Sequence, residues 1–143
     1  MKQITITLCT ACIILFSCND TKTDGTTATM ILGGRYQESI NKGSMMGQPF
    51  EGRSIVGYDN AKKMLVSSWV DNMGTGMMTM EGTWDSTTHS VNFKGKVVDP
   101  MTGKDMDCRE TFTMIDDNTQ KIEMWCTQYG KEMKTMEINF KRR

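Results

Sequence analysis

The chain has 143 residues, of which 17 are basic and 17 acidic, so its formal net charge is zero. Nucleic-acid-binding proteins carry an excess of Lys and Arg on one face, and equal numbers of acidic and basic residues give no such excess. The sequence has one histidine, no glycine-rich phosphate loop, no zinc spacing and no nucleophile motif. We therefore expect neither an enzyme nor a nucleic-acid-binding protein, and no cofactor or metal site.

The first predicted element is an export signal in residues 1–17. Lys2 begins a minimal basic region, residues 4–16 are apolar apart from threonines and cysteines, and Ser17 and Cys18 follow. A cysteine directly after the cut is typical of a bacterial lipobox, with ordinary signal cleavage as the alternative. The run is too short for a membrane-spanning helix, which needs about 20 residues. We expect a lipid on Cys18 and an anchored protein of the bacterial cell envelope.

Residues 18–29 are predicted to be a flexible tether between the lipid and the folded domain. Residues 19–27 are rich in Thr, Asp and Gly, and they show no apolar spacing that would bury them. Asn19, and not an aspartate, follows the cysteine, which under the usual sorting rule favours the outer membrane over the inner one in a Gram-negative host. The folded domain is expected over residues 30–143.

From Met30 onward the sequence predicts an all-β domain. Asp, Asn and Gly recur between the apolar segments and mark hairpin turns. Within the segments, apolar and polar residues alternate with a period of two, as in strands with one wet face. Long strands with short connections favour an antiparallel up-and-down meander that curls into a barrel. The eight expected strands are at about 30–41, 49–58, 63–71, 75–84, 89–98, 105–115, 120–129 and 132–141.

Several short segments are similar to those of a known bacterial family. They are residues 31–36, 45–52, 57–60, 69–76, 99–104 and 134–138. In this order, over about residues 28–142, the chain resembles domain-of-unknown-function family 1579. The resemblance implies a lipocalin-like (calycin-type) barrel, but it implies no activity, because none is assigned to the family. Such proteins have a further tryptophan-containing strand before the Gly-Gly-Arg motif. Three outcomes therefore stay open: a barrel open on one side, one closed by a second chain in an oligomer, or a shortened one.

Strand alternation assigns aromatic, methionine and glutamate side chains to the barrel interior. An apolar cavity with a few polar groups is the usual plan of a small-molecule site. Methionine, with fifteen copies in the chain, adapts to varied apolar shapes, and this interpretation is favoured over soft-metal binding. The candidate ligand-binding residues are Tyr36, Glu38, Tyr58, Met80, Trp84, Phe93, Glu110, Phe112 and Met124.

Glu110 or Glu38 is expected to hold the polar end of a small apolar or amphipathic ligand. Two alternatives stay open. The carboxylates could turn outward or pair with arginines, because buried charges are usually paired. The barrel could also be filled by its own side chains, which would make the protein a structural or interaction lipoprotein without a ligand.

Cys108 and Cys126 are candidates for a disulfide in an oxidising compartment. They share the inward parity on neighbouring strands, and a hairpin centred on Asp117 sets them opposite each other. A two-residue loop at Asp117 and Asn118 would instead place Cys108 opposite Thr127. The sequence alone leaves both registers open.

Overall fold

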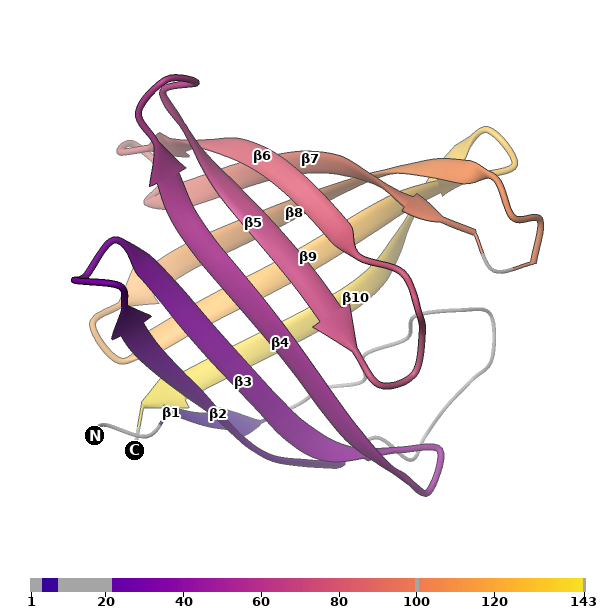
Figure 1. Cartoon of the computed structure of the whole chain (residues 1–143), viewed down its shortest axis with the longest axis horizontal. Coiled ribbons are helices and arrows are strands. Elements are labelled where there is room, and N and C mark those ends of the chain that lie inside the picture. The colour runs from indigo at the N-terminus through magenta and orange to yellow at the C-terminus, as the bar shows by residue number, and fades with distance from the viewer. Residues whose placement is uncertain (1–3, 8–21, 100, 143) are drawn as a thin grey trace.

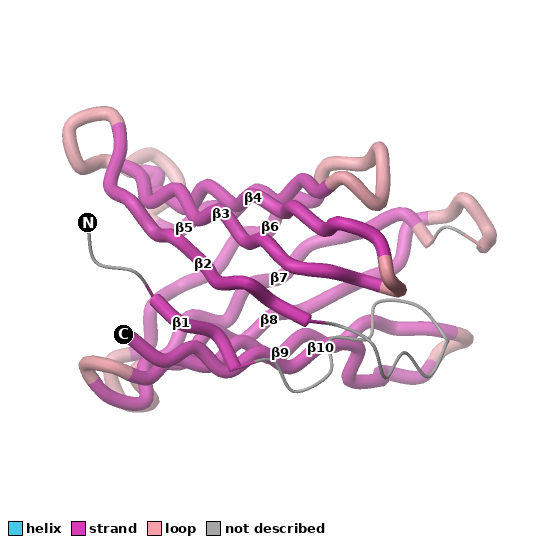
Figure 2. Tube along the Cα trace, turned by 90° about the horizontal axis from the view of Figure 1, so that it is seen from below, coloured by secondary structure: helices cyan, strands magenta, loops and turns pink. Residues whose placement is uncertain are grey.

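The structure, a computed structural model, describes residues 4–7, 22–99 and 101–142. Figure 2 shows strands joined by loops, and these residues contain no helix, so none is long and apolar enough to cross a membrane. The strands are β1 (Ile4–Thr7), β2 (Lys22–Ile31), β3 (Tyr36–Met45), β4 (Gln48–Asp59), β5 (Met64–Asp71), β6 (Met78–Asp85), β7 (Ser90–Val98), β8 (Asp105–Asp116), β9 (Thr119–Gln128) and β10 (Lys131–Arg142).

From β2 to β10 each strand pairs antiparallel with the next, so the predicted all-β up-and-down meander is confirmed. In Figure 1, β2–β5 cross in front of β8–β10, as expected when a twisted sheet curls on itself. The seven expected strands after residue 41 correspond to β4–β10, with bounds that differ by at most three residues.

Strand β1 lies between β2 and β10 and closes the strand order into a barrel. It pairs with β10 from Ile4 to Thr7, but only Ile4 pairs with β2, opposite Thr26. Without a strand here, β2 and β10 would both expose unpaired backbone N–H and C=O groups. The two sides of β1 therefore have the least strand pairing in the barrel, since every other neighbouring pair of strands shares five or more residue pairs.

The expected first strand at 30–41 and the expected tether at 18–29 are both wrong in part. A turn at residues 32–35 splits the expected strand, because Leu32, Gly33 and Gly34 adopt positive φ angles of 50°, 71° and 80°. The residues before the turn form β2, which pairs with β3 along nearly its whole length. The folded domain therefore includes Lys22–Ile31, where threonines with high strand propensity replace the apolar alternation that we sought.

Directly opposed residues on neighbouring strands point to the same side of the sheet, so the register traces the interior face around the barrel. We call the row of opposed positions that includes Glu110 the Glu110 row, and the interior the lumen. Its buried members Phe93 and Met124 show that this row faces inward. The row consists of Tyr58, Leu65, Gly82, Phe93, Glu110, Met124 and Met136.

Two glycines let β6 and β7 bend toward the lumen. A Cβ atom added at Gly82 would lie 2.6 Å from the carbonyl oxygen of Asn92, and one at Gly95 would lie 2.4 Å from that of Thr79. Both contacts are with backbone, which cannot move aside as a side chain can. Glycine inside a strand commonly marks such a close approach at a barrel corner.

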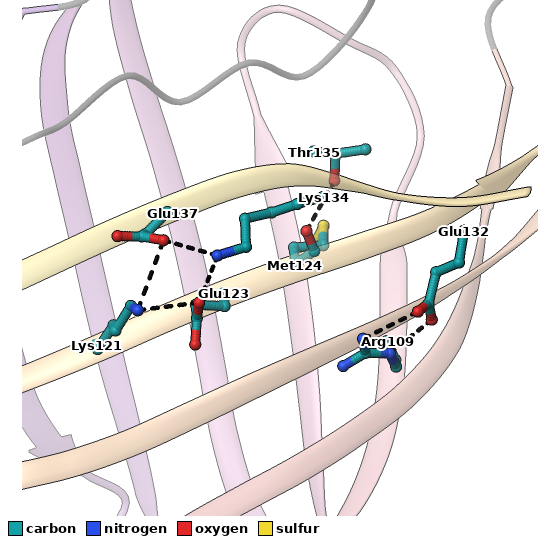
Figure 3. A network of polar contacts seen from close by, with 8 residues as sticks. All are labelled: Arg109, Lys121, Glu123, Met124, Glu132, Lys134, Thr135 and Glu137. Atoms are coloured by element: carbon teal, nitrogen blue, oxygen red, sulfur yellow. Dashed lines mark hydrogen bonds and ion pairs between the residues drawn. The ribbon is translucent and has the colours of Figure 1, made fainter.

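The outer face of β8–β10 carries a network of charged side chains (Figure 3). Lys134 donates hydrogen bonds to Glu123 and Glu137 at 2.6 and 2.8 Å, and Lys121 lies 2.9 Å from Glu123. These contacts hold the pKa of Glu123 below its ordinary value, chiefly through the hydrogen bond from Lys134. This part of the outer face is therefore hydrophilic.

Candidate ligand-binding site in the barrel

Glu110 points into the lumen from the middle of β8. Its direct neighbours in the ladder are Phe93 on β7 and Met124 on β9, both buried. Burial raises the pKa of Glu110 from 4.5 to about 7. Within residues 4–7, 22–99 and 101–142, no hydrogen bond or ion pair reaches its carboxyl group. Glu110 is half-buried by solvent exposure, but it is desolvated by the apolar groups around it. A desolvated carboxylate without a partner costs free energy, so Glu110 is the position where a ligand could contribute most.

The neighbouring arginine does not neutralise Glu110. Arg109 follows the alternation of β8 to the outer face, where its Nε and Nη2 donate hydrogen bonds of 2.6 and 3.0 Å to Glu132. Its guanidinium also lies 3.8 Å from the ring centroid of Trp125. The alternative in which Glu110 turns outward to pair with Arg109 is therefore excluded.

The lumen supplies little charge to compensate Glu110. Among the lumen-facing positions of β4–β9, the titratable groups besides Glu110 are Tyr58 and Asp71, and no Lys or Arg occurs there. Asp71 accepts a hydrogen bond of 2.7 Å from Nε1 of Trp69. Along β4–β9 the site around Glu110 is thus largely apolar, with no basic side chain beside the acid.

A pocket of about 410 Å³ opens at one end of the barrel. Tyr58 and Leu65, which line it, belong to the Glu110 row. Farther along the row the ring of Phe93 lies over Gly82, where an added Cβ would be 2.9 Å from it. The pocket is lined by Tyr58, Lys63, Met64, Leu65, Thr83 and Trp84. We call it the mouth pocket, because two of its lining residues stand at the end of the row of lumen-facing positions that includes Glu110.

Most of the expected interior residues do face the lumen. The register places Trp84 beside Val91 and Phe112, and Met80 beside Gly95, in rows adjacent to the Glu110 row. Met80 is the most completely buried large side chain of the described residues. The confirmed lumen-facing candidates are Tyr58, Met80, Trp84, Phe93, Glu110, Phe112 and Met124.

The expectation that Tyr36 and Glu38 face inward is wrong. Tyr36 lies opposite Gly57 and Glu38 opposite Ile55, which places both on the outer face. The ring of Tyr36 covers Gly57, where an added Cβ would lie 2.4 Å from it. The expected parity came from a strand starting at Met30, but β3 starts after the turn, and a shift of one residue moves every side chain to the other face.

Cys108 and Cys126 form a disulfide beside the Glu110 row, with Cα atoms 4.1 Å apart. The β8–β9 hairpin does have the two-residue loop that would have displaced them, since Asp116 pairs with Thr119. A β-bulge between Met114 and Asp116 then shifts the register by one residue and restores the pairing. The bulge could not be read from the alternation pattern.

The remaining site predictions have different outcomes. Cys18, the predicted lipidation site, lies outside the described residues. Within the part of the chain that the structure describes, no three His, Cys, Asp or Glu side chains are grouped to hold a metal ion. The sequence interpretation missed the role of Leu65, because Leu65 and Met64 competed for the inward parity; pairing of Leu65 with Gly82 settles it.

The sequence of the chain was compared with those of known proteins. A family described as protein of unknown function, DUF1579, has a model that matches residues 17–142, which include every strand from β2 to β10. The resemblance inferred from the short segments is thereby confirmed. No curated protein matches the chain in sequence. The chain belongs to the DUF1579 family of proteins of unknown function.

Proposed function

We propose that the protein is a lipid-anchored envelope protein, not an enzyme, that holds one small apolar or amphipathic molecule in its barrel. The observation that carries this proposal is Glu110, an acid set between Phe93 and Met124 with no basic side chain facing it from β4–β9. A barrel of this size can be filled by side chains or hold one small ligand. The mouth pocket at the end of the Glu110 row supports the second arrangement.

The chemistry of Glu110 indicates the kind of head group that the ligand carries. Near pH 7 its carboxyl group is partly ionised, because burial has raised its pKa to about 7. An ammonium group would neutralise the ionised form, and a hydroxyl or amide could donate a hydrogen bond to it. The apolar tail would lie against methionine and aromatic side chains, which adapt to shape and supply contact area.

The membrane anchor is supported by the order of residues 15–18, a short apolar run ending in a small residue and a cysteine. Metabolic labelling with a fatty-acid probe tests it. We expect the wild-type protein to be labelled, and the Cys18→Ala variant to be unlabelled and recovered in the soluble fraction. Absence of label on the wild type would refute the anchor.

Cleavage before Cys18 would also remove β1. The edges of β2 and β10 would then lack the strand that joins them in the full chain. Exposed edges favour pairing with another chain, so we expect the processed protein to be open at this junction or to dimerise there. Native mass spectrometry of the processed protein, purified from its host, reports the oligomeric state and any co-purifying ligand together.

A set of probes with one tail and three head groups tests the binding site. We expect a long-chain amine to bind more tightly than the alcohol, and the carboxylate least. The affinity for the amine should rise as the pH increases through 7, since Glu110 then ionises. Glu110→Gln should weaken amine binding by about 1–3 kcal/mol and leave the alcohol nearly unchanged.

A matched pair of variants separates binding from folding. Phe93→Asp places a charge in the lumen and should abolish binding of all three probes, and Met80→Glu should act likewise. Asn92→Asp adds the same charge one residue away on the outer face and should bind normally. If folded wild-type protein binds none of the probes saturably, the barrel is a structural element without a ligand.

A further inference from the structure

The connectivity gathers the loops of the barrel at two ends. The hairpins β3–β4, β5–β6, β7–β8 and β9–β10 turn at one end, which lies to the right in Figure 1, and the other four turn at the opposite end. We call the first set the anchor-end loops and the second the mouth-end loops. The mouth pocket belongs to the second end, because Lys63 lies in the β4–β5 loop and Trp84 precedes the β6–β7 loop.

Each anchor-end loop exposes a large apolar or aromatic side chain. The exposed fractions are 61% for Met46, 71% for Met77, 72% for Met101 and 87% for Tyr129. The mouth-end loops, at residues 32–35, 60–63, 86–89 and 117–118, expose Leu32. The other exposed apolar side chains at that end lie on the strands and not in the loops; they are Met30, Tyr36, Tyr58, Trp84, Met114 and Ile115. Exposed apolar groups gathered on one surface commonly mark an interaction site.

In two of the anchor-end loops an aspartate side chain accepts hydrogen bonds from the backbone, while the apolar side chains stay exposed. Asp71 Oδ1 accepts hydrogen bonds of 2.9 and 3.0 Å from the backbone N–H groups of Met73 and Gly74. Asp99 Oδ1 accepts one of 2.9 Å from the N–H of Met101. These contacts restrain the backbone beside Met73 and Met101 while Met77 and Met101 stay in solvent.

The charge of these loops agrees with an apolar partner. The β3–β4, β5–β6 and β9–β10 loops contain no Asp, Glu, Lys or Arg between their strands, and the β7–β8 loop contains Asp99 and Lys104. The mouth-end loops include Arg35, Lys62 and Lys63. The anchor-end loops therefore carry few groups that would oppose entry into the interface of a bilayer.

The position of the predicted lipid indicates that the partner of the anchor-end loops is a lipid surface. β2 starts at Lys22, which pairs with Ser44 beside the β3–β4 turn, so the chain enters the barrel at the anchor end. Cys18 precedes Lys22 by four residues, and four residues span at most about 14 Å. A lipid on Cys18 must therefore reach the bilayer close to Met46.

We propose that the anchor-end loops lie on the lipid surface, with Met46, Met77, Met101 and Tyr129 in the interfacial region and the mouth pocket open to the side away from the membrane. This inference rests on the proposed lipid anchor at Cys18. It gives the barrel a fixed orientation, in which a ligand enters from the aqueous side. Binding by the loops adds buried apolar area to the membrane affinity of the acyl chains.

Methionine oxidation tests the orientation within a single molecule. The lipidated protein in vesicles of phosphatidylethanolamine and phosphatidylglycerol is treated with hydrogen peroxide, and sulfoxides are located by peptide mass spectrometry. Met30, which lies near the mouth end and is 58% exposed, serves as the internal reference. We expect Met46, Met77 and Met101 to oxidise several-fold more slowly, relative to Met30, than they do in the unlipidated Cys18→Ala protein without vesicles.

The outcomes separate this inference from the proposal on which it rests. If fatty acid is incorporated but the ratios to Met30 are unchanged in vesicles, the orientation is wrong and the anchor stands. If no fatty acid is incorporated, the anchor itself is wrong. If the tips are protected in whole cells but not in protein-free vesicles, a protein covers this end and the lipid surface is not the partner.

Discussion

The barrel has two facing walls, β2–β5 and β6–β10, and their lumen-facing side chains differ. All seven buried apolar side chains of the described residues lie on β6–β10. The lumen-facing positions of β2–β5 are largely small or polar, and they include Ser39, Asn41, Ser54 and Ser67. Large side chains pack one wall into a core, while the side chains on the facing wall are shorter. The difference indicates that stability resides mainly in β6–β10.

The outer faces show the reverse distribution. The outer face of β8–β10 carries the network of Lys121, Glu123, Lys134 and Glu137, whereas that of β3–β5 exposes Tyr36, Ile55 and Val70. A strand alternates its two faces, so a wall with a strongly apolar interior has a polar exterior. On β3–β5 the contrast between the faces is weak, and sequence alternation there is a poorer guide to orientation.

The largest expected effect compares one core position on each wall. Phe93→Ala, on β7, should lower the free energy of unfolding by about 3–5 kcal/mol, the usual range for a buried aromatic. A matched pair is Val91→Ala on β7 and Val56→Ala on the facing wall, which remove the same two methyl groups. The second should cost less, because Val91 is buried and Val56 only partly so. Urea denaturation of both variants measures the difference. Equal costs would mean that the walls contribute alike and that our comparison is wrong.

The disulfide adds to the apolar wall. It links Cys108 and Cys126, 18 residues apart in sequence, across β8 and β9. Replacing both cysteines with alanine should lower the free energy of unfolding by about 2–4 kcal/mol, because the unfolded chain gains freedom. Denaturation under oxidising conditions measures it, with the reduced wild-type protein as the control. A reduced wild type as stable as the oxidised one would show that the bridge adds nothing.

Glu110 is the single acid on the lumen face of β6–β10, and the stability that the protein loses by burying it depends on pH. Its folded-state pKa of about 7 lies above its ordinary value of 4.5, so the folded protein retains a proton that the unfolded chain releases. Stability therefore falls as the pH rises from 4.5 to 7, and the full penalty applies above 7. Glu110→Gln should raise the free energy of unfolding by about 1–3 kcal/mol at pH 8.5.

At pH 4 the Glu110→Gln substitution should have almost no effect, because the carboxyl group is then protonated in both states. Thermal or urea unfolding at the two pH values measures the contrast. A constant effect across this range would show that Glu110 is solvated or paired in the folded protein.

Glu123, on the outer face, should show a small effect of opposite sign. The hydrogen bond from Lys134 lowers its pKa, so its contribution is present above its unfolded pKa and is lost as the pH falls through the folded one. Glu123→Gln should therefore destabilise the protein at pH 7, but by no more than about 0.5–1 kcal/mol, since such pairs are partly solvated. At pH 3 its unfolding curve should approach that of wild type, and a loss that persists there would implicate packing instead.

Much of the fold was predictable from sequence because the information is local. Period-two alternation in β7 and β8 identified Phe93 and Glu110 as inward-facing, and short turns after each strand implied antiparallel neighbours. The same parity made Cys108 and Cys126 candidates for a disulfide but left two registers open, and the bulge in β8 decided between them. Within one hairpin, the register follows from the loop length and the parity of the two strands.

The sequence by itself therefore determined an antiparallel β meander, the apolar lumen face of β6–β9 and the placement of Glu110 on it. Only the tertiary structure decided that the threonine-rich segment forms β2, that Tyr36 and Glu38 turn outward, and that a bulge aligns Cys108 with Cys126. Alternation reports which residues avoid water, but it does not report which strands pair or where one residue is inserted. Those depend on backbone hydrogen bonds between distant segments, and a shift of one residue reverses every face that follows.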